Sequence, residues 1–234
     1  MASAKTAARH FLLTGVPGVG KTTLMVKVHK ELVKQGFHCS GFITEEVRVS
    51  GRRIGFDVVT MDGVHGQLAR VSDSSVSVPG ARQREYKVGQ YTVNLSSFEQ
   101  TALPTLQLLI HPEGSKQRKQ IFLVDEIGKM ESFSKNFIKA VQKLISHPDV
   151  VVIATIPVPK GKPIPIVEEL RNGVHSVVFE EIFELLRAQL LVKQAVTMLR
   201  CNKTPQKVLK RNYNCLKFKK SKTPQKLGVG LKFC

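Results

Sequence analysis

An eight-residue run near the amino terminus has the residues and the spacing of a phosphate-binding loop. It matches G-x-x-x-x-G-K-[ST] at every fixed position and consists of Gly15, Val16, Pro17, Gly18, Val19, Gly20, Lys21 and Thr22. Glycines let the backbone curl so that successive N–H groups face one centre, and a following helix adds the positive end of its dipole. We expect Lys21 to reach the β- and γ-phosphates of a nucleotide and Thr22 to place its hydroxyl on Mg²⁺.

Two carboxylates follow a second apolar run. Residues 121–124 are typical of a buried strand, and Asp125 and Glu126 come directly after it. In open α/β sheets ligands bind at the carboxyl ends of the strands. We expect Asp125 to hold Mg²⁺ and Glu126 to orient and deprotonate an attacking water, with Ile127 and Gly128 beside the nucleotide. A carboxylate that activates water favours hydrolysis over phosphoryl transfer to an acceptor.

Asp125 and Gly128 also match the D-x-x-G pattern of regulatory GTPases. No guanine-reading N-K-x-D motif follows, because Asn202-Lys203-Thr204-Pro205 lacks the aspartate. The sequence therefore predicts weak discrimination between bases.

A further cation usually assists phosphoryl transfer, because charge spreads over the γ-phosphate oxygens. Arg171, at the end of a short helix after a Pro-rich loop, is our candidate for this catalytic role. Thr155, which ends a predicted strand, could sense the γ-phosphate. Other cationic candidates lie in a predicted hairpin and in the Pro-rich loop: Arg48, Arg52, Arg53, Lys160 and Lys162. An ordinary structural or solvated position stays open for each of these side chains.

Strand-like and helix-like segments alternate along the chain, which predicts an α/β fold with a mostly parallel central sheet covered by helices on both faces. The predicted strands are 11–14, 86–93, 121–124, 150–154 and 174–179, with a β-hairpin over 41–60 that turns at Ser50-Gly51. The predicted helices are 21–35, 96–110, 134–145, 166–171 and 181–199, and 72–84 is predicted to be a surface loop.

The size and charge of the chain indicate one domain with an appendage. The 234 residues, 42% of them hydrophobic, suit a single NTPase domain over 1–200 followed by a basic tail over 201–234. Residues 185–234 hold 13 of the 36 basic residues and none of the 18 acidic ones, which leaves residues 1–184 with a net charge of +5. The string Lys-Thr-Pro-Gln-Lys occurs twice in the tail, at 203–207 and 222–226. We expect such low-complexity sequence to be disordered.

Several broad classes of protein are not indicated. The longest apolar stretch, residues 150–158, is too short to span a bilayer, and residues 1–9 lack the apolar run of a signal peptide. We expect a cytoplasmic monomer that binds nucleoside triphosphates and has no membrane partner. The four cysteines show no metal-ligand spacing, so free thiols are expected at Cys39, Cys201, Cys215 and Cys234.

With both motifs in place, the chain resembles a P-loop family, the cancer-related nucleoside-triphosphatases, which is shared by vertebrates, archaea and thermophilic bacteria. The resemblance covers about residues 9–178 and ends after about Phe179. It implies slow Mg²⁺-dependent hydrolysis of ATP, GTP and other nucleoside triphosphates, with little base preference, on a RecA-like fold. The likeness rests on residues 15–23, which include Thr23, and on 41–48, 51–59, 88–91, 125–131 and 155–163.

Two other functions stay open on the sequence alone. A nucleotide or small-molecule kinase shares the loop at Gly15 but normally lacks a water-activating glutamate, so phosphate release without an acceptor distinguishes the two. A nucleic-acid-binding protein that uses ATP as a switch is suggested by the basic tail. Such binding would weaken steeply with salt and would require residues 185–234.

Overall fold

The computed structural model describes residues 8–72, 86–109, 119–180 and 196. In chain order the elements are β1 (His10–Thr14), α1 (Lys21–Lys34), β2 (Cys39–Val49), β3 (Arg52–Thr60), β4 (His65–Val71), β5 (Tyr86–Val88), β6 (Tyr91–Val93), α2 (Leu95–Ala102), β7 (Gln120–Val124), α3 (Lys135–Ser146), β8 (Val150–Thr155), α4 (Pro165–Asn172) and β9 (Ser176–Glu180), with 3-10 turns at Leu103–Leu106 and Glu131–Phe133.

Within these residues the strands form one sheet in the order β5-β6-β4-β3-β2-β7-β8-β1-β9. The half that contains β2, β7, β8, β1 and β9 is parallel. The other half is an antiparallel extension that begins where β3 pairs with β2. The predicted α/β fold with a mainly parallel centre is confirmed.

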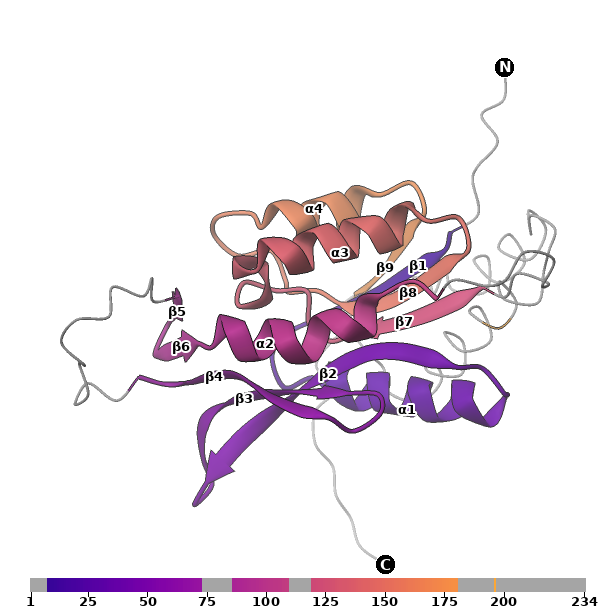
Figure 1. Ribbon diagram of the computed structural model, residues 1–234. Coiled ribbons are helices and arrows are strands. Elements are labelled where there is room, and N and C mark those ends of the chain that lie inside the picture. Colours follow the sequence, from indigo (N-terminus) through magenta and orange to yellow (C-terminus); the bar gives the residue numbers. More distant parts are fainter. Residues whose placement is uncertain (1–7, 73–85, 110–118, 181–195, 197–234) are drawn as a thin grey trace, which may run out of the picture.

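The central strands are buried on both faces, and successive side chains enter opposite cores. On β7, Phe122 and Val124 belong to one cluster, whereas Ile121 and Leu123 belong to the other. The first core also receives α2, α3 and α4, through residues such as Phe98, Phe137 and Leu170. The second receives α1. Figure 1 shows α3 and α4 side by side on one face of the sheet and α1 on the other.

Sequence signals at the helix ends agree with the observed boundaries. Asn94 accepts a hydrogen bond from the amide of Ser97 at the start of α2, and Ser134 accepts one from the amide of Phe137 at the start of α3. Pro165 occupies the first turn of α4, where its missing N–H costs no hydrogen bond. The side chains of Asn94 and Ser134 thus satisfy amide donors that have no partner within the helix.

The strand register brings three carboxyl ends to one edge of the sheet. Leu13 pairs with Thr155, and Val124 pairs with Ala154, so the segments after β1, β7 and β8 emerge together. Phe42 pairs with Val124, and β2 then continues to Val49 alongside β3. The hairpin therefore projects past the end of β7 (Figure 1). Gly41 makes the close pairing possible, because a Cβ there would lie 1.9 Å from the carbonyl oxygen of Leu123.

Two predicted elements have the wrong bounds, and one strand is missing from the sequence-based prediction. The predicted helix over 96–110 ends at Ala102 and becomes a 3-10 turn, because Pro104 has no N–H for an α-helical bond. The predicted strand over 86–93 is a hairpin of β5 and β6, which turns at Gly89 with φ 57°. Strand β4 has no predicted counterpart, because its apolar residues Leu68 and Ala69 are adjacent and do not alternate with polar ones. Both are buried in the structure.

Other expectations fall on residues that the structure does not describe. These are the loop over 72–84 beyond Ser72, the helix over 181–199 apart from Val196, and the tail over 201–234. Val196 is buried in the core that contains α1. Among the described helices, none is long and apolar enough to cross a membrane.

Candidate active site

The Gly-rich loop between β1 and α1 is an open cradle of main-chain amides. Gly18 and Gly20 have φ values of 78° and 97°, a left-handed region that side chains disfavour. Helix α1 begins at Lys21 without a side-chain cap and without an acidic residue in its first turn. Its first amides and the positive end of its dipole therefore remain available to an anion.

The side chain of Lys21 lies back over this loop. Its ammonium donates hydrogen bonds to the carbonyl oxygens of Gly15, at 2.9 Å, and Val16, at 3.3 Å. Both acceptors belong to the cradle itself. The charge of Lys21 is thus held at the mouth of the loop, where the sequence predicts a triphosphate.

Asp125 connects the loop helix to the end of β7. The hydroxyl of Thr22 donates a 2.6 Å hydrogen bond to Oδ2, and the hydroxyl of Thr155 donates one to Oδ1. The amide of Thr44, on β2, also interacts with this carboxylate. Asp125 is 2% exposed. Three elements thus converge on one buried carboxylate, and the hydroxyl of Thr155 is already engaged there.

The two adjacent acids are electrostatically linked. Burial raises the pKa of Asp125, and the hydrogen bonds from Thr155 and Thr22 and the charge of Lys21 oppose that rise. Burial and the charge of Asp125 raise the pKa of Glu126, again against Lys21. A carboxylate whose pKa is raised holds a proton more firmly, so Glu126 is a stronger base than an exposed glutamate.

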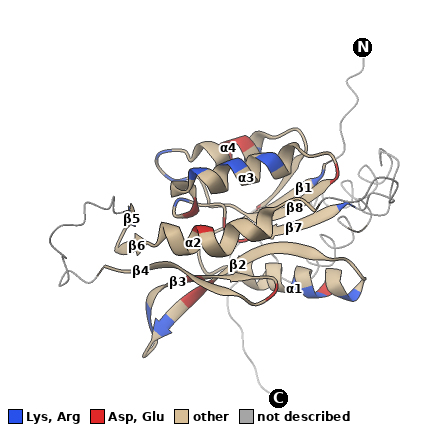
Figure 2. Cartoon of the chain, in the orientation of Figure 1, with Lys and Arg blue, Asp and Glu red and all other residues tan. Residues whose placement is uncertain are grey.

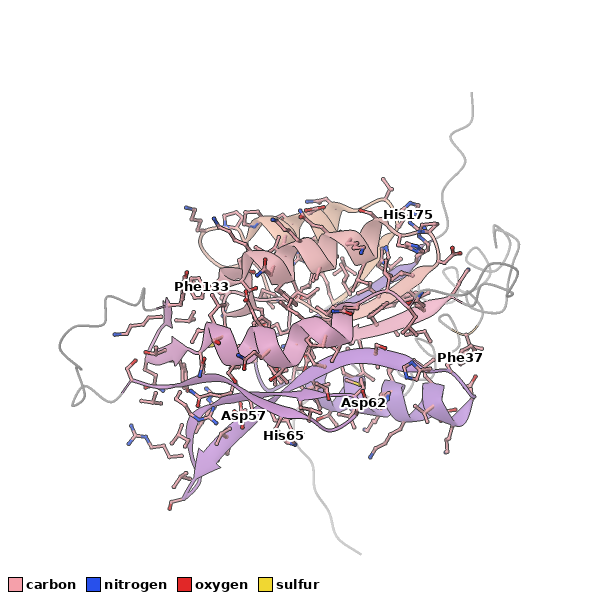
Figure 3. The ribbon with its side chains drawn as sticks, viewed as in Figure 1. Phe37, Asp57, Asp62, His65, Phe133 and His175 are labelled. Carbon is pink, nitrogen blue, oxygen red and sulfur yellow. The ribbon has the colours of Figure 1, made fainter. Side chains whose placement is uncertain are left out.

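A third acid, Glu131, supports the turn after β7, although its position in the sequence predicts no role in the site. Its Oε2 accepts a 3.1 Å hydrogen bond from the amide of Gly128, and the side chain is 4% exposed. Burial raises the pKa of Glu131 to about 8, and the charge of Glu126 adds to the rise. Phe133, the last residue of this turn, shows where the turn lies in Figure 3, at the opposite side of the view from His175.

Arg171, the sequence-based choice for an assisting cation, holds the Pro-rich loop after β8. One guanidinium nitrogen donates a 3.0 Å hydrogen bond to the carbonyl oxygen of Pro157, and Nε lies 3.8 Å from Glu168. Lys160 and Lys162 are exposed in the same loop. The described contacts of Arg171 are therefore with this loop and its own helix.

Two of the hairpin arginines are paired within the hairpin. Both Arg48 and Arg53 contact the carboxylate of Glu46, each at 2.5 Å, and Arg53 also donates to the hydroxyl of Tyr91. These charges lie on the projecting part of β2 and β3 (Figure 2). Arg52 is exposed beside the turn.

Within the described residues, no group of three or more His, Cys, Asp or Glu side chains is arranged to hold a metal ion. The one described cysteine, Cys39, is buried, and burial raises the pKa of its thiol to about 12. The other three cysteines lie outside the described residues. A protein-only metal cage is therefore absent from this part of the chain.

The fold and the site together define a class. A strand, a Gly-rich loop and a helix carry lysine and threonine, while an acidic pair follows β7, with β8 between the two strands. This is the arrangement of a P-loop NTPase. Residues 10–191 match the family described as NTPase, and the chain belongs to that family.

Relatives agree on this assignment. The human cancer-related nucleoside-triphosphatase is 52% identical over 172 residues, which cover 74% of this chain and 87% of the relative. The nucleoside-triphosphatase THEP1 of Thermotoga sp. (strain RQ2) is 42% identical over 170 residues, or 72% and 84% of the two chains. The resemblance found in the sequence is confirmed.

Two solved structures share the fold. The solution structure of a human cancer-related nucleoside triphosphatase superimposes with a TM-score of 0.67 at 47% identity, covering 84% of this chain and 100% of that one. The crystal structure of THEP1 from Aquifex aeolicus gives a TM-score of 0.60 at 34% identity, with 82% and 99% covered.

Proposed function

We propose that this chain hydrolyses nucleoside 5′-triphosphates to diphosphate and phosphate at the site formed by residues 15–23 and 125–128. The observation that carries the proposal is the 2.6 Å hydrogen bond between Thr22 and Asp125. It places the phosphate cradle and the acidic pair side by side. The names of the relatives, all nucleoside-triphosphatases, support the same activity.

The loop amides and Lys21 would bind the phosphates. The uncapped first turn of α1 offers N–H donors, and the ammonium of Lys21 lies within reach of the same space. Lys21 would exchange its two carbonyl acceptors for oxygens of the β- and γ-phosphates. Charge-assisted hydrogen bonds to phosphate are stronger than those to a neutral carbonyl, which favours the exchange.

The donor set around Asp125 fits Mg²⁺. A hydroxyl and a carboxylate, 2.6 Å apart, are hard oxygen ligands, and this cation keeps several waters and takes phosphate oxygens rather than a full protein cage. Thr22 would ligate the ion directly, and Asp125 would hold its water shell. When bound, Mg²⁺ neutralises charge on the β- and γ-phosphates.

Glu126 would act as the general base. A water oxygen attacks the γ-phosphorus, a proton of that water passes to Glu126, and the bond from the γ-phosphorus to the bridging oxygen breaks. The electron pair of that bond stays on the diphosphate. Burial and the neighbouring Asp125 strengthen Glu126 as a base, which supports this assignment.

We retain Arg171, in the last turn of α4, as the proposed assisting cation beside the Pro-rich loop that follows β8. Its hydrogen bond to Pro157 supports a role in fixing this loop, which follows β8 at the same sheet edge as Asp125. Lys160 and Lys162 would then face the triphosphate from the loop. Besides holding the loop, the guanidinium of Arg171 is proposed to contact the γ-phosphate directly.

We further propose that residues 1–200 form the NTPase domain, that 201–234 is a basic appendage, and that the protein is a cytoplasmic monomer. The match to the NTPase family ends at residue 191, which supports the boundary. A kinase activity is less favoured, because Glu126, as the proposed general base, would deprotonate water without any acceptor hydroxyl.

Phosphate release tests the proposed function. It should be measured on the full chain with ATP, GTP, CTP and UTP, with and without Mg²⁺, and without any acceptor. We expect release from all four nucleotides, at rates within about tenfold of one another, because the chain lacks the guanine-reading N-K-x-D motif. We expect it only with Mg²⁺, because the ion would neutralise charge on the phosphates. Formation of the nucleoside diphosphate only with an added acceptor, which gains the phosphoryl group while no free phosphate is released, would identify a kinase instead.

A further inference from the structure

Glu131 is a buried acid that the proposed reaction does not use. It lies in the 3-10 turn that follows β7, and its carboxyl is 4% exposed. An uncompensated charge at such a position is costly, so a buried carboxyl needs a partner or a proton. The described partner of its Oε2 is the amide of Gly128.

The carboxyl groups of Glu126 and Glu131 converge on Gly128. A Cβ placed on Gly128 would lie 2.6 Å from Oε1 of Glu126 and 3.0 Å from Oε2 of Glu131. The carbonyl oxygen of Gly128 is held as well, by the amide of Ser132 at 3.1 Å and by its hydroxyl at 2.5 Å. Gly128 is thus fixed on both sides, and Glu126 lies directly against it.

We propose that Glu131 is the positioning residue for Glu126: its carboxyl accepts the hydrogen bond from the amide of Gly128 and thereby holds the base, which lies against Gly128, in the orientation that water activation requires. The inference rests on the proposed function. A neutral acid can lie beside the carboxylate of Glu126 without repulsion, whereas a second buried anion could not.

The ionisable surroundings agree with a neutral Glu131. Among the described residues, the charges that raise the pKa of Glu131 are those of Glu126 and, more weakly, Asp125, both at the end of β7, whereas hydrogen bonds from the amides of Glu131 and Gly128 oppose the rise. Lys21 acts on these two acids. With burial, the two negative charges raise the pKa of Glu131 to about 8, so the proton is retained near neutral pH.

Two substitutions separate the hydrogen bond from the volume of the side chain. Glu131→Gln keeps a carbonyl acceptor for Gly128 and is permanently neutral. Glu131→Met keeps an unbranched chain of similar length but leaves the buried amide of Gly128 without a partner. Glu99→Ala is the control for a carboxylate at the other end of this turn, because Glu99 accepts hydrogen bonds from Ser134 and Asn136 at the start of α3, whereas the amide of Gly128 bonds to Glu131.

The test is the steady-state rate of phosphate release from MgATP, with kcat and KM measured from near pH 6 to near pH 9. We expect Glu131→Gln to keep kcat within about threefold, and Glu131→Met to lose about tenfold or more in kcat at unchanged KM, the scale of a misplaced catalytic group. Above about pH 8 the wild type should lose activity that Glu131→Gln keeps. Glu99→Ala should change thermal stability and leave kcat unchanged.

Equal losses in Glu131→Gln and Glu131→Met would overturn the proposal, because they would mean that an ionised carboxylate is needed. Wild-type kcat in Glu131→Met, or the same alkaline profile in wild type and Glu131→Gln, would overturn it too. A wild-type protein that releases no phosphate would instead contradict the proposed hydrolysis, so the two failures are distinguishable.

Discussion

The hydroxyl of Thr22 lies 2.6 Å from Oδ2 of Asp125, although the two residues are separated by 103 positions in the chain. This contact joins the first turn of α1 to the end of β7. Strand β8 lies between β1 and β7, so the loop and the acidic pair face each other across one intervening strand. The proposed function places the γ-phosphate beside this contact, next to Lys21 and Glu126.

Thr22→Val should raise the Mg²⁺ concentration required for half-maximal phosphate release. Valine keeps the shape of threonine but removes the hydroxyl that donates to Asp125 and that would ligate the ion. The expected increase is about tenfold or more, the scale of a disturbed metal site. Phosphate release titrated with Mg²⁺ measures it, with Thr92→Val on β6 as the control. An unchanged Mg²⁺ requirement would remove Thr22 from the metal site.

Lys21→Ala should weaken both nucleotide binding and turnover. The ammonium that now contacts Gly15 and Val16 is the proposed partner of the β- and γ-phosphates. Loss of a charge-assisted hydrogen bond predicts a rise in Kd of about 10- to 100-fold. Calorimetric titration with a non-hydrolysable ATP analogue checks this, and Lys27→Ala, on the exposed face of α1, is the control. Wild-type affinity would show that Lys21 does not touch the phosphates.

Gly128→Ala should lower kcat while nucleotide affinity is retained. The new methyl group would overlap Oε1 of Glu126 at 2.6 Å and approach Oε2 of Glu131 at 3.0 Å. A displaced base predicts a loss of about tenfold or more, since small misplacements of catalytic groups are costly. Gly173→Ala, whose Cβ would meet only Ser176 and α4 backbone, is the matched control. Equal kcat in both variants would contradict the close packing described here.

His10 should make the protein less stable in acid. Its ring contacts the carbonyl oxygen of Ile145 at 3.0 Å, and burial lowers the pKa of His10 from 6.5 to about 4. The unfolded chain therefore binds a proton that the native protein does not, and stability falls as the pH drops from 6.5 towards 4. The contribution is at most about 1.4 kcal/mol per pH unit.

His10→Gln should remove that part of the pH dependence, because the side chain no longer titrates. Urea unfolding at several pH values compares the two proteins, so that contributions from other groups cancel in the difference. Parallel curves for wild type and variant across this range would exclude His10 as the cause. Activity near neutral pH should be unaffected, since His10 lies at the start of β1.

Local patterns were sufficient to predict the elements that hold the site. The loop motif, the apolar strand before Asp125 and the hairpin turn at Ser50-Gly51 each depend on residues adjacent in sequence. Strand β4 escaped prediction because His65, Gly66 and Gln67 give it a polar start and its burial comes from distant neighbours. Pro104 explains the early end of α2, which the apolar periodicity alone does not predict.

The residues of the site also differ in how far the local sequence alone identifies them. The sequence suggested Asp125, Glu126 and Thr155 because they end apolar strands, but only the register of β7 and β8 places Thr155 against Asp125. Glu131 gave no signal of burial, because the residues around it, 128–133, show neither a strand period nor a helix period. Its packing against Gly128 depends on the turn that follows β7.

The most direct test of the account compares wild type with Glu126→Gln, measuring MgATP affinity and phosphate release on the same samples. Glutamine keeps the shape of the side chain and removes the base. The account predicts unchanged affinity with turnover lowered about a hundredfold or more, the usual scale for a lost general base. Phosphate release at the wild-type rate by Glu126→Gln would contradict it.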